Sequence, residues 1–348
     1  MQRDELVKAL GHIYPALANN DRIPALLNFC FNGKQVMAYD SMLGIIAPCE
    51  TEDTFSVHGK TLLGLLSNSH SEEADFSMES EQDILVKSGK SRFHLPYWPI
   101  EDFLWKEPDE KWVLQFKMDD GFAAGLEACL MTTSVDLTQQ KLLGIAFVPN
   151  GQTMALYSCN SDALTRFQTS IKKAAVKIDD LIPKTFCESL LRIRRETEAK
   201  TTTVKISKDW ICGHFDNGYR VYGNLQTVEG GLVDYEALID KTLKGSPAYA
   251  KVPKELAGAL ARARVVADIE NSKTIMTIGQ GKLKLHTETK YSGLVEDTIP
   301  WPDKSQVTAD VAAMYVQQAI GVCDSMTITE RCTAYKKDDI FILVSNMG

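Results

Sequence analysis

Residues 142–166 read LLGIAFVPNGQTMALYSCNSDALTR, a stretch in which two β-prone runs flank an Asn-Gly pair. An apolar run from Leu142 to Val148 leads to Asn150-Gly151, and a second β-prone run follows from Gln152 to Cys159. Asn-Gly tolerates positive φ at both centres of a two-residue type I′ turn, whose twist matches that of the flanking strands. The stretch therefore predicts a β-hairpin.

The same pattern occurs at two other places in the chain. β-prone runs flank each of the turns Asn32-Gly33, Asn150-Gly151 and Gly279-Gln280-Gly281. Gly33 lies 118 positions before Gly151, and Gly281 lies 130 positions after it. A hairpin that recurs at such spacing predicts three tandem copies of one domain.

The expected domains are residues 1–108, 109–240 and 241–348. Each copy is expected to contain a helix, strands, a second helix and further strands, which gives an α+β fold with large antiparallel sheets. Apolar spacing and capping residues place the six helices at residues 4–18, 59–67, 122–132, 183–198, 253–268 and 308–320. The proline- and acid-rich segment 96–111 is expected to link the first two copies, with Trp98 and Trp105 covering a domain edge.

Composition excludes several classes of protein. A hydrophobic content of 44% and a charged content of 24% are typical of soluble globular domains. No apolar run approaches the roughly 20 residues that span a bilayer, and the opening MQRDELVKAL is not an export signal, so a cytoplasmic location is expected.

The eight cysteines form no C-x-x-C pair, and no phosphate-binding glycine loop is present, so we expect reduced thiols, no metal and no cofactor. A net charge of −8 disfavours tight nucleic-acid binding over the whole surface but permits a local basic patch.

Three stretches carry a resemblance to a known family. They are ILVKSGKSRFHLPYWPIEDF (84–103), residues 142–164 of the opening stretch, and VEGGLVDY (228–235). Together with the element order, they resemble the bacterial DNA sliding clamp, the beta subunit of DNA polymerase III. The resemblance implies three similar domains in a crescent, and two crescents that close head to tail into a ring around duplex DNA.

The chain also departs from that family's pattern. Where the family has aspartate, glycine, histidine and arginine before a leucine, this chain has Asn160, Ser161, Asp162 and Ala163. Val233 replaces a usual proline, and the ending LVSNMG replaces a more apolar one. These differences predict a docking pocket that is retained in position but changed in chemistry.

A sliding clamp holds a polymerase on DNA by topology, so the resemblance implies no catalysis and weak, sequence-independent phosphate contacts. The basic residues expected to face double-stranded DNA are Arg3, Lys8, Arg22, Lys184, Arg192, Arg195, Lys254, Arg262 and Arg264. Arg192 and Arg195 are three apart on one predicted helix and so share a face. The predicted helices 122–132 and 308–320 contain no Lys or Arg, which weakens this expectation.

The resemblance also implies a pocket for short peptides with apolar anchors, through which a DNA polymerase and a clamp loader would dock. Its expected residues are Leu142, Cys159, Ser161, Leu164, Val233, Leu238, Cys332, Ala334, Leu343, Val344 and Met347. By position alone, each of them is also a reasonable core residue. A third partner is a second copy of the chain. An open crescent leaves unpaired strand edges, and we expect residues 74–79 of one copy to pair with 293–297 of the other.

Two alternatives remain open at this point. One is a tandem-repeat α+β scaffold that does not bind DNA. The other is a cysteine-dependent enzyme, because Cys212 and His214 are two apart in a predicted strand and would point to the same face.

Overall fold

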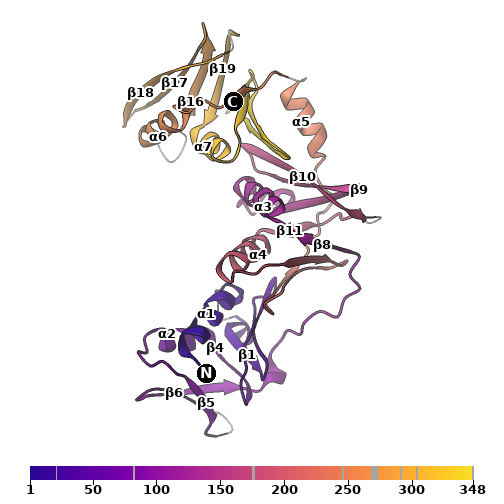
Figure 1. The fold of residues 1–348 in the computed structure, drawn as a ribbon, viewed down its shortest axis with the longest axis vertical. Helices are drawn as coiled ribbons and strands as arrows, with labels where there is room; N and C mark the ends of the chain where they lie inside the picture. The colour runs from indigo at the N-terminus through magenta and orange to yellow at the C-terminus, as the bar shows by residue number, and fades with distance from the viewer. Residues whose placement is uncertain are drawn as a thin grey trace. The chain divides into compact units, whose positions relative to one another are not determined.

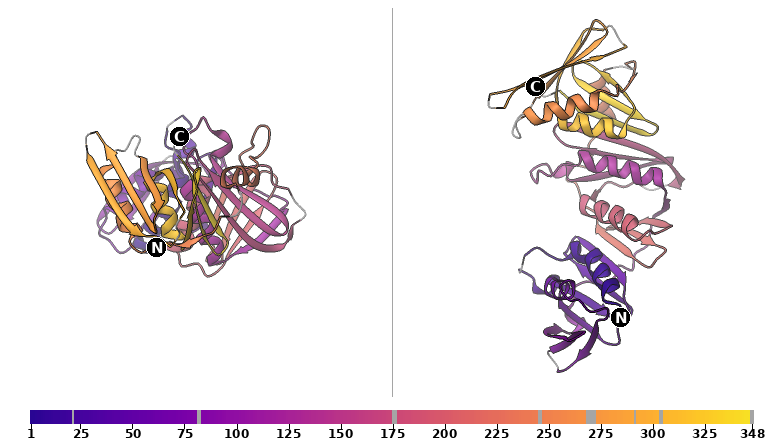
Figure 2. Two further views of the ribbon diagram at one scale, coloured as in Figure 1. Left: turned by 90° about the horizontal axis from the view of Figure 1, so that it is seen from above. Right: turned by 60° about the vertical axis from the view of Figure 1, so that its left-hand side comes forward.

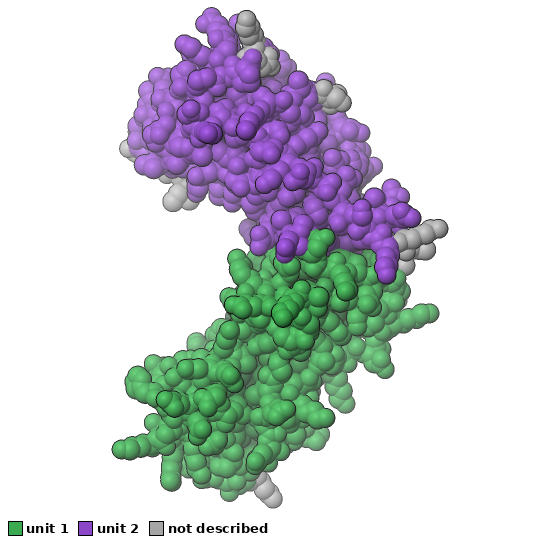
Figure 3. Space-filling model, viewed as in Figure 1, with its two compact units in different colours: residues 1–119, 185–225 green, residues 120–184, 226–348 purple. Residues whose placement is uncertain are grey.

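The computed structural model describes residues 1–348 except 21, 81–82, 175–176, 245–246, 268–272, 291, 303–304 and 347–348. Helices and large antiparallel sheets make up the chain, which confirms the expected α+β class (Figure 1). The chain divides into two compact units. Unit 1 comprises Met1–Asp119 with Thr185–Leu225, and unit 2 comprises Asp120–Lys184 with Gln226–Gly348 (Figure 3).

Unit 1 is built on one 11-stranded sheet in which neighbouring strands are antiparallel. In sheet order its strands are β5 (Asp75–Met78), β6 (Asp83–Ser88), β7 (Ser91–Trp98), β4 (Thr54–His58), β1 (Asn28–Asn32), β2 (Gln35–Tyr39), β3 (Leu43–Pro48), β14 (Arg220–Asn224), β13 (Trp210–Phe215), β12 (Thr202–Ile206) and β8 (Leu114–Met118).

The helices of unit 1 pack on one face of this sheet (Figure 1, Figure 2). They are α1 (Arg3–Ile13), α2 (Gly59–Ser67) and α4 (Lys184–Glu196), the last belonging to this unit from Thr185 onward. Apolar residues at helical spacing, such as Leu6, Leu10 and Ile13 of α1, are buried against the sheet. Close approach of α4 requires a glycine below it, because a Cβ at Gly213 would lie 2.1 Å from Cδ1 of Leu190.

The other face of the sheet is covered by the expected linker. Trp105 is 5% exposed and packs in a cluster with Cys30, Met37, Ile46 and Tyr222. Trp98 is 37% exposed. The indole of Trp105 is therefore part of a second core layer rather than a cover at a domain edge, and the segment after β7 is packed structure.

Unit 2 contains two antiparallel sheets. The 7-stranded sheet has the order β11 (Leu181–Pro183), β9 (Gly144–Cys159), β10 (Ala163–Ala174), β22 (Ile340–Ser345), β21 (Cys332–Lys337), β20 (Ser325–Ile328) and β15 (Ala250–Lys251). The 4-stranded sheet has the order β18 (Gly293–Pro300), β17 (Lys282–Thr289), β16 (Lys273–Gly279) and β19 (Val307–Ala312), and its orange strands lie side by side in Figure 2.

Helices pack on both faces of the 7-stranded sheet. On one face lie α3 (Asp120–Thr132) and α7 (Ala313–Val322), with α6 (Leu256–Val266) beside α7. On the other face lies α5 (Tyr235–Leu243). Adjacent residues of β10 show the two faces: Thr165 accepts a hydrogen bond from Thr132 of α3, and Arg166 pairs with Glu236 of α5.

Two of the three predicted hairpins are confirmed. The first joins β1 to β2, but Gly33 (φ 89°) and Lys34 form its turn, because Asn32 ends β1 and its Oδ1 accepts hydrogen bonds from the N–H groups of Lys34 and Gln35. The third joins β16 to β17 through Gln280 (φ 55°) and Gly281 (φ 73°), the two positive φ angles of a type I′ turn.

The central stretch differs from its prediction. Residues 144–159 form one strand element, β9, instead of two separate strands. Gly151 still has a positive φ of 62°, and β9 changes partner along its length, since residues 144–146 pair with β11 and residues 151–159 pair with β10. The hairpin turn between β9 and β10 lies at residues 160–162.

One predicted helix is wrong in its first part. Residues 307–312 form β19, and α7 begins only at Ala313. Ala309 and Val311 alternate inward in this strand, and β19 pairs with β16 along its whole length. Pairing with β16 thus overrides the helical spacing.

Both large sheets join residues from different expected copies. Strand β14 pairs with β3, which joins the second copy to the first, and β22 pairs with β10, which joins the third copy to the second. The middle copy is consequently shared between the two compact units. Division at residues 108 and 240 stays a prediction.

Candidate functional site

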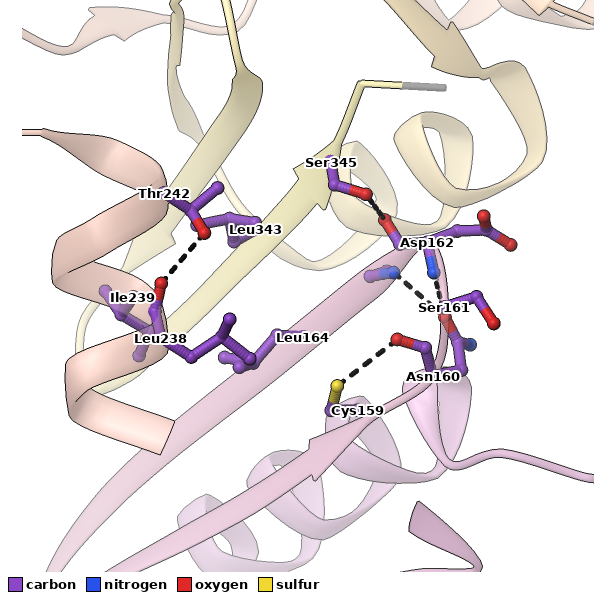
Figure 4. A pocket seen from close by; sticks show the side chains of 11 residues that line it. Cys159, Asn160, Ser161, Asp162, Leu164, Leu238, Ile239, Thr242, Leu343 and Ser345 are labelled. Carbon is purple, nitrogen blue, oxygen red and sulfur yellow. Dashed lines mark hydrogen bonds between the residues drawn. The ribbon is translucent and has the colours of Figure 1, made fainter. Parts of the chain in front are cut away.

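A pocket in unit 2 lies between the sheet face that carries α5 and the helix itself (Figure 4). Its floor follows the register of the strands: Cys159 of β9 lies opposite Leu164 of β10, and Leu164 lies opposite Leu343 of β22. Ala334 of β21 continues the same row opposite Leu343. Because the row is formed by directly opposed residues, all four side chains point to one face of the sheet.

Helix α5 supplies one wall of the pocket. Leu238, Ile239 and Thr242 line the cavity, whose volume is about 90 Å³. Leu238 is 37% exposed, whereas Ile239 is buried against the sheet. A partly exposed leucine above an apolar floor is suited to an apolar anchor residue of a partner.

The opposite wall is the turn between β9 and β10. Asn160 fixes this turn, because its Oδ1 accepts hydrogen bonds of 2.9 Å from the N–H groups of Asp162 and Ala163. Its Nδ2 donates to the hydroxyl of Tyr315, 3.0 Å away on α7. The end of β22 is tied to the turn as well, since Ser345 N donates to the carbonyl oxygen of Asp162 at 2.7 Å. The turn is thus held by both neighbouring elements.

The structure brings most of the expected pocket residues together. Five of them line the cavity: Cys159, Ser161, Leu164, Leu238 and Leu343. Leu142, Val233, Cys332 and Ala334 belong to the apolar cluster below and around it. Val344 is buried in the separate cluster on the α7 side, because its side chain points to the other face of β22 from that of Leu343. Met347 lies outside the described residues.

Other residues that line the pocket were not among its expected contacts. They are Ile239, Thr242 and Ser345, together with Asn160, Asp162 and Ala163, which the sequence indicated only as departures from the family pattern. The spacing of Leu238 and Thr242, four apart on a helix, could have indicated Thr242. Ser345 had no such signal, because only the pairing of β22 with β10 brings it to the turn.

The expected DNA-facing residues fall into three groups. Lys8, Arg22, Arg195 and Lys254 are exposed. Arg262 and Arg264 are also exposed but have protein partners, because Arg262 Nη2 lies 2.7 Å from Asp297 Oδ1 and Arg264 Nη1 donates to Gln317 Oε1 at 2.6 Å. The third group consists of the less exposed Arg3, Lys184 and Arg192.

Arg3 and Arg192 are bound to the protein's own backbone. Arg3 Nε donates to the carbonyl oxygen of Ser71 at 3.0 Å, and Arg192 Nη2 donates to the carbonyl oxygen of His12. Arg192 and Arg195 therefore act differently although they are three apart on α4: Arg192 joins α4 to α1, and Arg195 is exposed to solvent.

Cys212 and His214 do not form a catalytic pair. Cys212 is fully buried, and burial raises the pKa of its thiol, so the nucleophilic thiolate is disfavoured. Burial, with the charges of Lys205 and Arg220, lowers the pKa of His214 to about 4. The hydroxyl of Tyr222 lies 3.4 Å from His214 Nε2 and donates to Glu107 Oε1, so this cluster fastens the segment after β7 to the sheet.

The described part of the chain offers neither a metal-binding cluster nor a membrane-spanning helix. Its His, Cys, Asp and Glu side chains form no group of three or more that could hold a metal ion. None of its helices has the length and apolarity needed to cross a membrane.

Comparison with solved structures decides the fold. A DNA polymerase sliding clamp from Bartonella birtlesii bound to griselimycin has a TM-score of 0.88 to this chain at 18% identity, with 100% of this chain and 98% of that chain covered. The chain has the sliding-clamp fold. A DNA polymerase III beta subunit from Pseudomonas aeruginosa gives 0.85 at 17% identity, covering 100% of this chain and 99% of that chain. A putative DNA polymerase III beta subunit from Eubacterium rectale gives 0.86 at 14% identity, covering 100% and 98%.

Comparison by sequence finds no such relationship, since no protein-family model and no curated protein matches the chain. The chain thus shares the sliding-clamp fold over its full length with proteins that are 14–18% identical to it. Within that fold, the two segments expected to close a ring are at sheet edges: β5 is the outermost strand of the 11-stranded sheet, and β18 is the outermost strand of the 4-stranded sheet.

Proposed function

We propose that this protein is a DNA polymerase processivity factor, a sliding clamp that encircles duplex DNA without catalysing a reaction. The observation that carries the proposal is the match to DNA polymerase III beta subunits over the full length of the chain, with TM-scores from 0.83 to 0.88. A tandem-repeat scaffold without DNA binding would have no need of exposed cations on the helices. Lys8 and Arg195 on α1 and α4 therefore favour the clamp.

Weak contacts suit this function. A protein that neutralises many phosphates binds DNA tightly and in a strongly salt-dependent way, whereas a clamp must slide. Four of the nine expected cations are exposed and have no side-chain hydrogen bond or ion pair within the described residues, while Arg3, Arg192, Arg262 and Arg264 bind the protein itself. If only these four of the nine candidates contact phosphates in each copy, the ring would be retained by topology more than by affinity.

In this proposal the pocket below α5 is the docking site for a polymerase and a clamp loader. Its floor residues Leu164 and Leu343 are apolar and buried, and Leu238 at its rim is partly exposed. Short peptide segments with apolar side chains fit such a site. Two copies of the chain would pair β5 with β18 to close the ring, since free strand edges are otherwise open to aggregation.

The test uses one plasmid in two forms. The protein is incubated with nicked circles, alone at high concentration or with a clamp loader, and the DNA is separated from free protein on a sizing column at moderate salt. We expect the protein to be retained on circles and released when a restriction enzyme linearises the same molecules. Equal retention on circular and linear DNA would indicate ordinary binding, and no retention on either would favour the scaffold.

A further inference from the structure

Helix α5 is short for an element that forms a wall of a pocket. It has 9 residues, of which Tyr235 and Ile239 are buried. Isolated helices of fewer than about 12–15 residues are marginal in water, so α5 depends on contacts with the sheet for its position. Its C-terminal end is held by Arg331, whose Nη1 donates to the carbonyl oxygen of Lys241 at 3.3 Å.

The N-terminal end of α5 is fastened by Glu236. The hydroxyl of Tyr157 donates to Glu236 Oε1 at 2.5 Å, and Nη1 of Arg166 lies 3.1 Å from both carboxylate oxygens. The rings of Tyr157 and Tyr235 stack at a centroid distance of 4.9 Å. Charge-assisted hydrogen bonds are shorter and stronger than neutral ones, and Glu236 accepts such bonds from both Tyr157 and Arg166.

This tie lies directly beside the pocket floor. Tyr157 and Arg166 are opposed in the register of β9 and β10, and the floor pair Cys159 and Leu164 is the next opposed pair on the same face. The guanidinium of Arg166 also lies over the ring of Phe341, 5.2 Å from its centroid. Glu236 therefore joins α5 directly to β9 and β10, and through Arg166 to β22, which are three of the four strands of the floor.

We propose that Glu236 is a positioning residue for the docking pocket, holding the α5 wall in place through Arg166 and Tyr157. Without it, Leu238 and Ile239 would no longer be held above Leu164 and Leu343, and a bound apolar anchor would lose one side of its contact. The Nε of Arg166 is already buried without a hydrogen-bond partner among the described residues, so loss of Glu236 would remove the carboxylate that its Nη1 contacts as well. The inference rests on the proposed docking function.

The first experiment measures hydrogen exchange of the α5 backbone amides in the full chain. Glu236→Ala is expected to accelerate this exchange by about tenfold, because a charged hydrogen-bond tie is removed. Asp240→Asn is the matched control: it removes the same charge from an exposed position on the same helix. Unchanged α5 exchange in Glu236→Ala would overturn the proposal.

Charge reversal distinguishes the ion pair between Glu236 and Arg166 from an effect of Glu236 on the helix dipole. An acidic residue in the first turn also stabilises a helix through its dipole, and an arginine there would be unfavourable. Glu236→Arg and Arg166→Glu should each accelerate exchange, and the double variant should recover protection. Failure of the double variant to recover would mean that Glu236 acts through the helix dipole alone.

The second experiment measures binding of griselimycin by calorimetry, since solved clamps from Pseudomonas aeruginosa and Bartonella birtlesii hold this molecule. Glu236→Ala should weaken binding by about tenfold and Asp240→Asn should not, because only the first variant releases the wall. Equal affinity of Glu236→Ala and the unmodified protein, or no binding by the unmodified protein, would overturn the link between the tie and docking. Loss of retention on DNA circles would instead count against the proposed function.

Discussion

The indole ring of Trp105 packs directly on Gly44 of β3, so that a Cβ at position 44 would lie 2.5 Å from ring atom Cζ2. This contact fastens the segment after β7 across the 11-stranded sheet. Gly44→Ala is expected to destabilise the protein by about 1–3 kcal/mol, because the added methyl group overpacks a closed contact. Urea denaturation followed by tryptophan fluorescence measures the change.

Gly64→Ala is the control for this variant. Gly64 lies in α2 with no atom within 4 Å of a Cβ at that position, so alanine should be neutral or stabilise the helix by up to about 1 kcal/mol. A Gly44→Ala protein as stable as Gly64→Ala would show that the Trp105 ring moves aside freely.

His214 should make stability depend on pH. Its pKa is lowered to about 4 in the folded chain by burial and by Lys205 and Arg220, so between pH 4 and the usual histidine value of 6.5 the unfolded chain binds more protons. The contribution of neutral His214 to the free energy of unfolding is therefore fully present above pH 6.5, and it decreases as the pH falls toward 4. The difference in urea midpoint between pH 7 and pH 5 should be smaller in His214→Gln than in the unmodified protein. An equal difference in urea midpoint in the two proteins would show that His214 does not cause the pH dependence.

Exposed arginines should affect DNA binding, whereas arginines bound to the protein's own backbone should affect stability. Arg195→Ala should reduce the slope of log affinity against log salt by about 1 for binding to short linear duplexes, because one phosphate contact is lost. Arg192→Ala should instead destabilise unit 1 by about 1–2 kcal/mol, since the carbonyl oxygen of His12 loses a charged donor. Filter binding over a salt series and thermal denaturation separate the two effects. Equal salt slopes for Arg195→Ala and the unmodified protein would remove α4 from the DNA-facing surface.

Leu238 should act as a docking contact more than as a core residue, because it is 37% exposed at the rim of the pocket. Leu238→Ala is expected to weaken griselimycin binding by about 30-fold, a typical hot-spot effect, with little change in melting temperature. Val265→Ala, at a position on α6 that is 83% exposed, is the matched control. Comparable losses in both variants would point to an effect on folding.

Ring closure predicts that a charge in the edge strand β18 disrupts the dimer. Leu294 is 53% exposed on this strand, and Leu294→Glu should convert a dimer into a monomer because it places a carboxylate between paired edges. Sedimentation velocity at micromolar concentration measures the change. Leu137→Glu, at a position that is 79% exposed away from β18, should leave the dimer intact. A monomeric unmodified protein would rule out this mode of closure.

Local features of the fold followed from short stretches of sequence. The bounds of α2 match the prediction from Gly59 to Ser67, and Gly281 has the positive φ expected of it. These features depend on the intrinsic preferences of a few neighbouring residues. Of the turns predicted at residues 33, 151 and 281, the first and third join two strands, whereas residue 151 lies inside β9.

Features that depend on partners distant in sequence could not be read in the same way. Residues 307–312 have helical apolar spacing but form a strand, because β16 provides their backbone hydrogen bonds. Arg3 and Arg192 look like surface cations in the sequence, and only the folded chain brings the carbonyl oxygens of Ser71 and His12 to them.

The α+β class, the first and third turns and most helix positions followed from the sequence, because these depend on contacts within a few residues. Which side chains share the pocket depends on the tertiary structure alone. Leu164 and Leu343 are 179 positions apart and meet because β10 and β22 pair in one register, while Val344 next to it faces the opposite side. A strand places alternate residues on opposite faces, so the site was decided by register, which no local pattern contains.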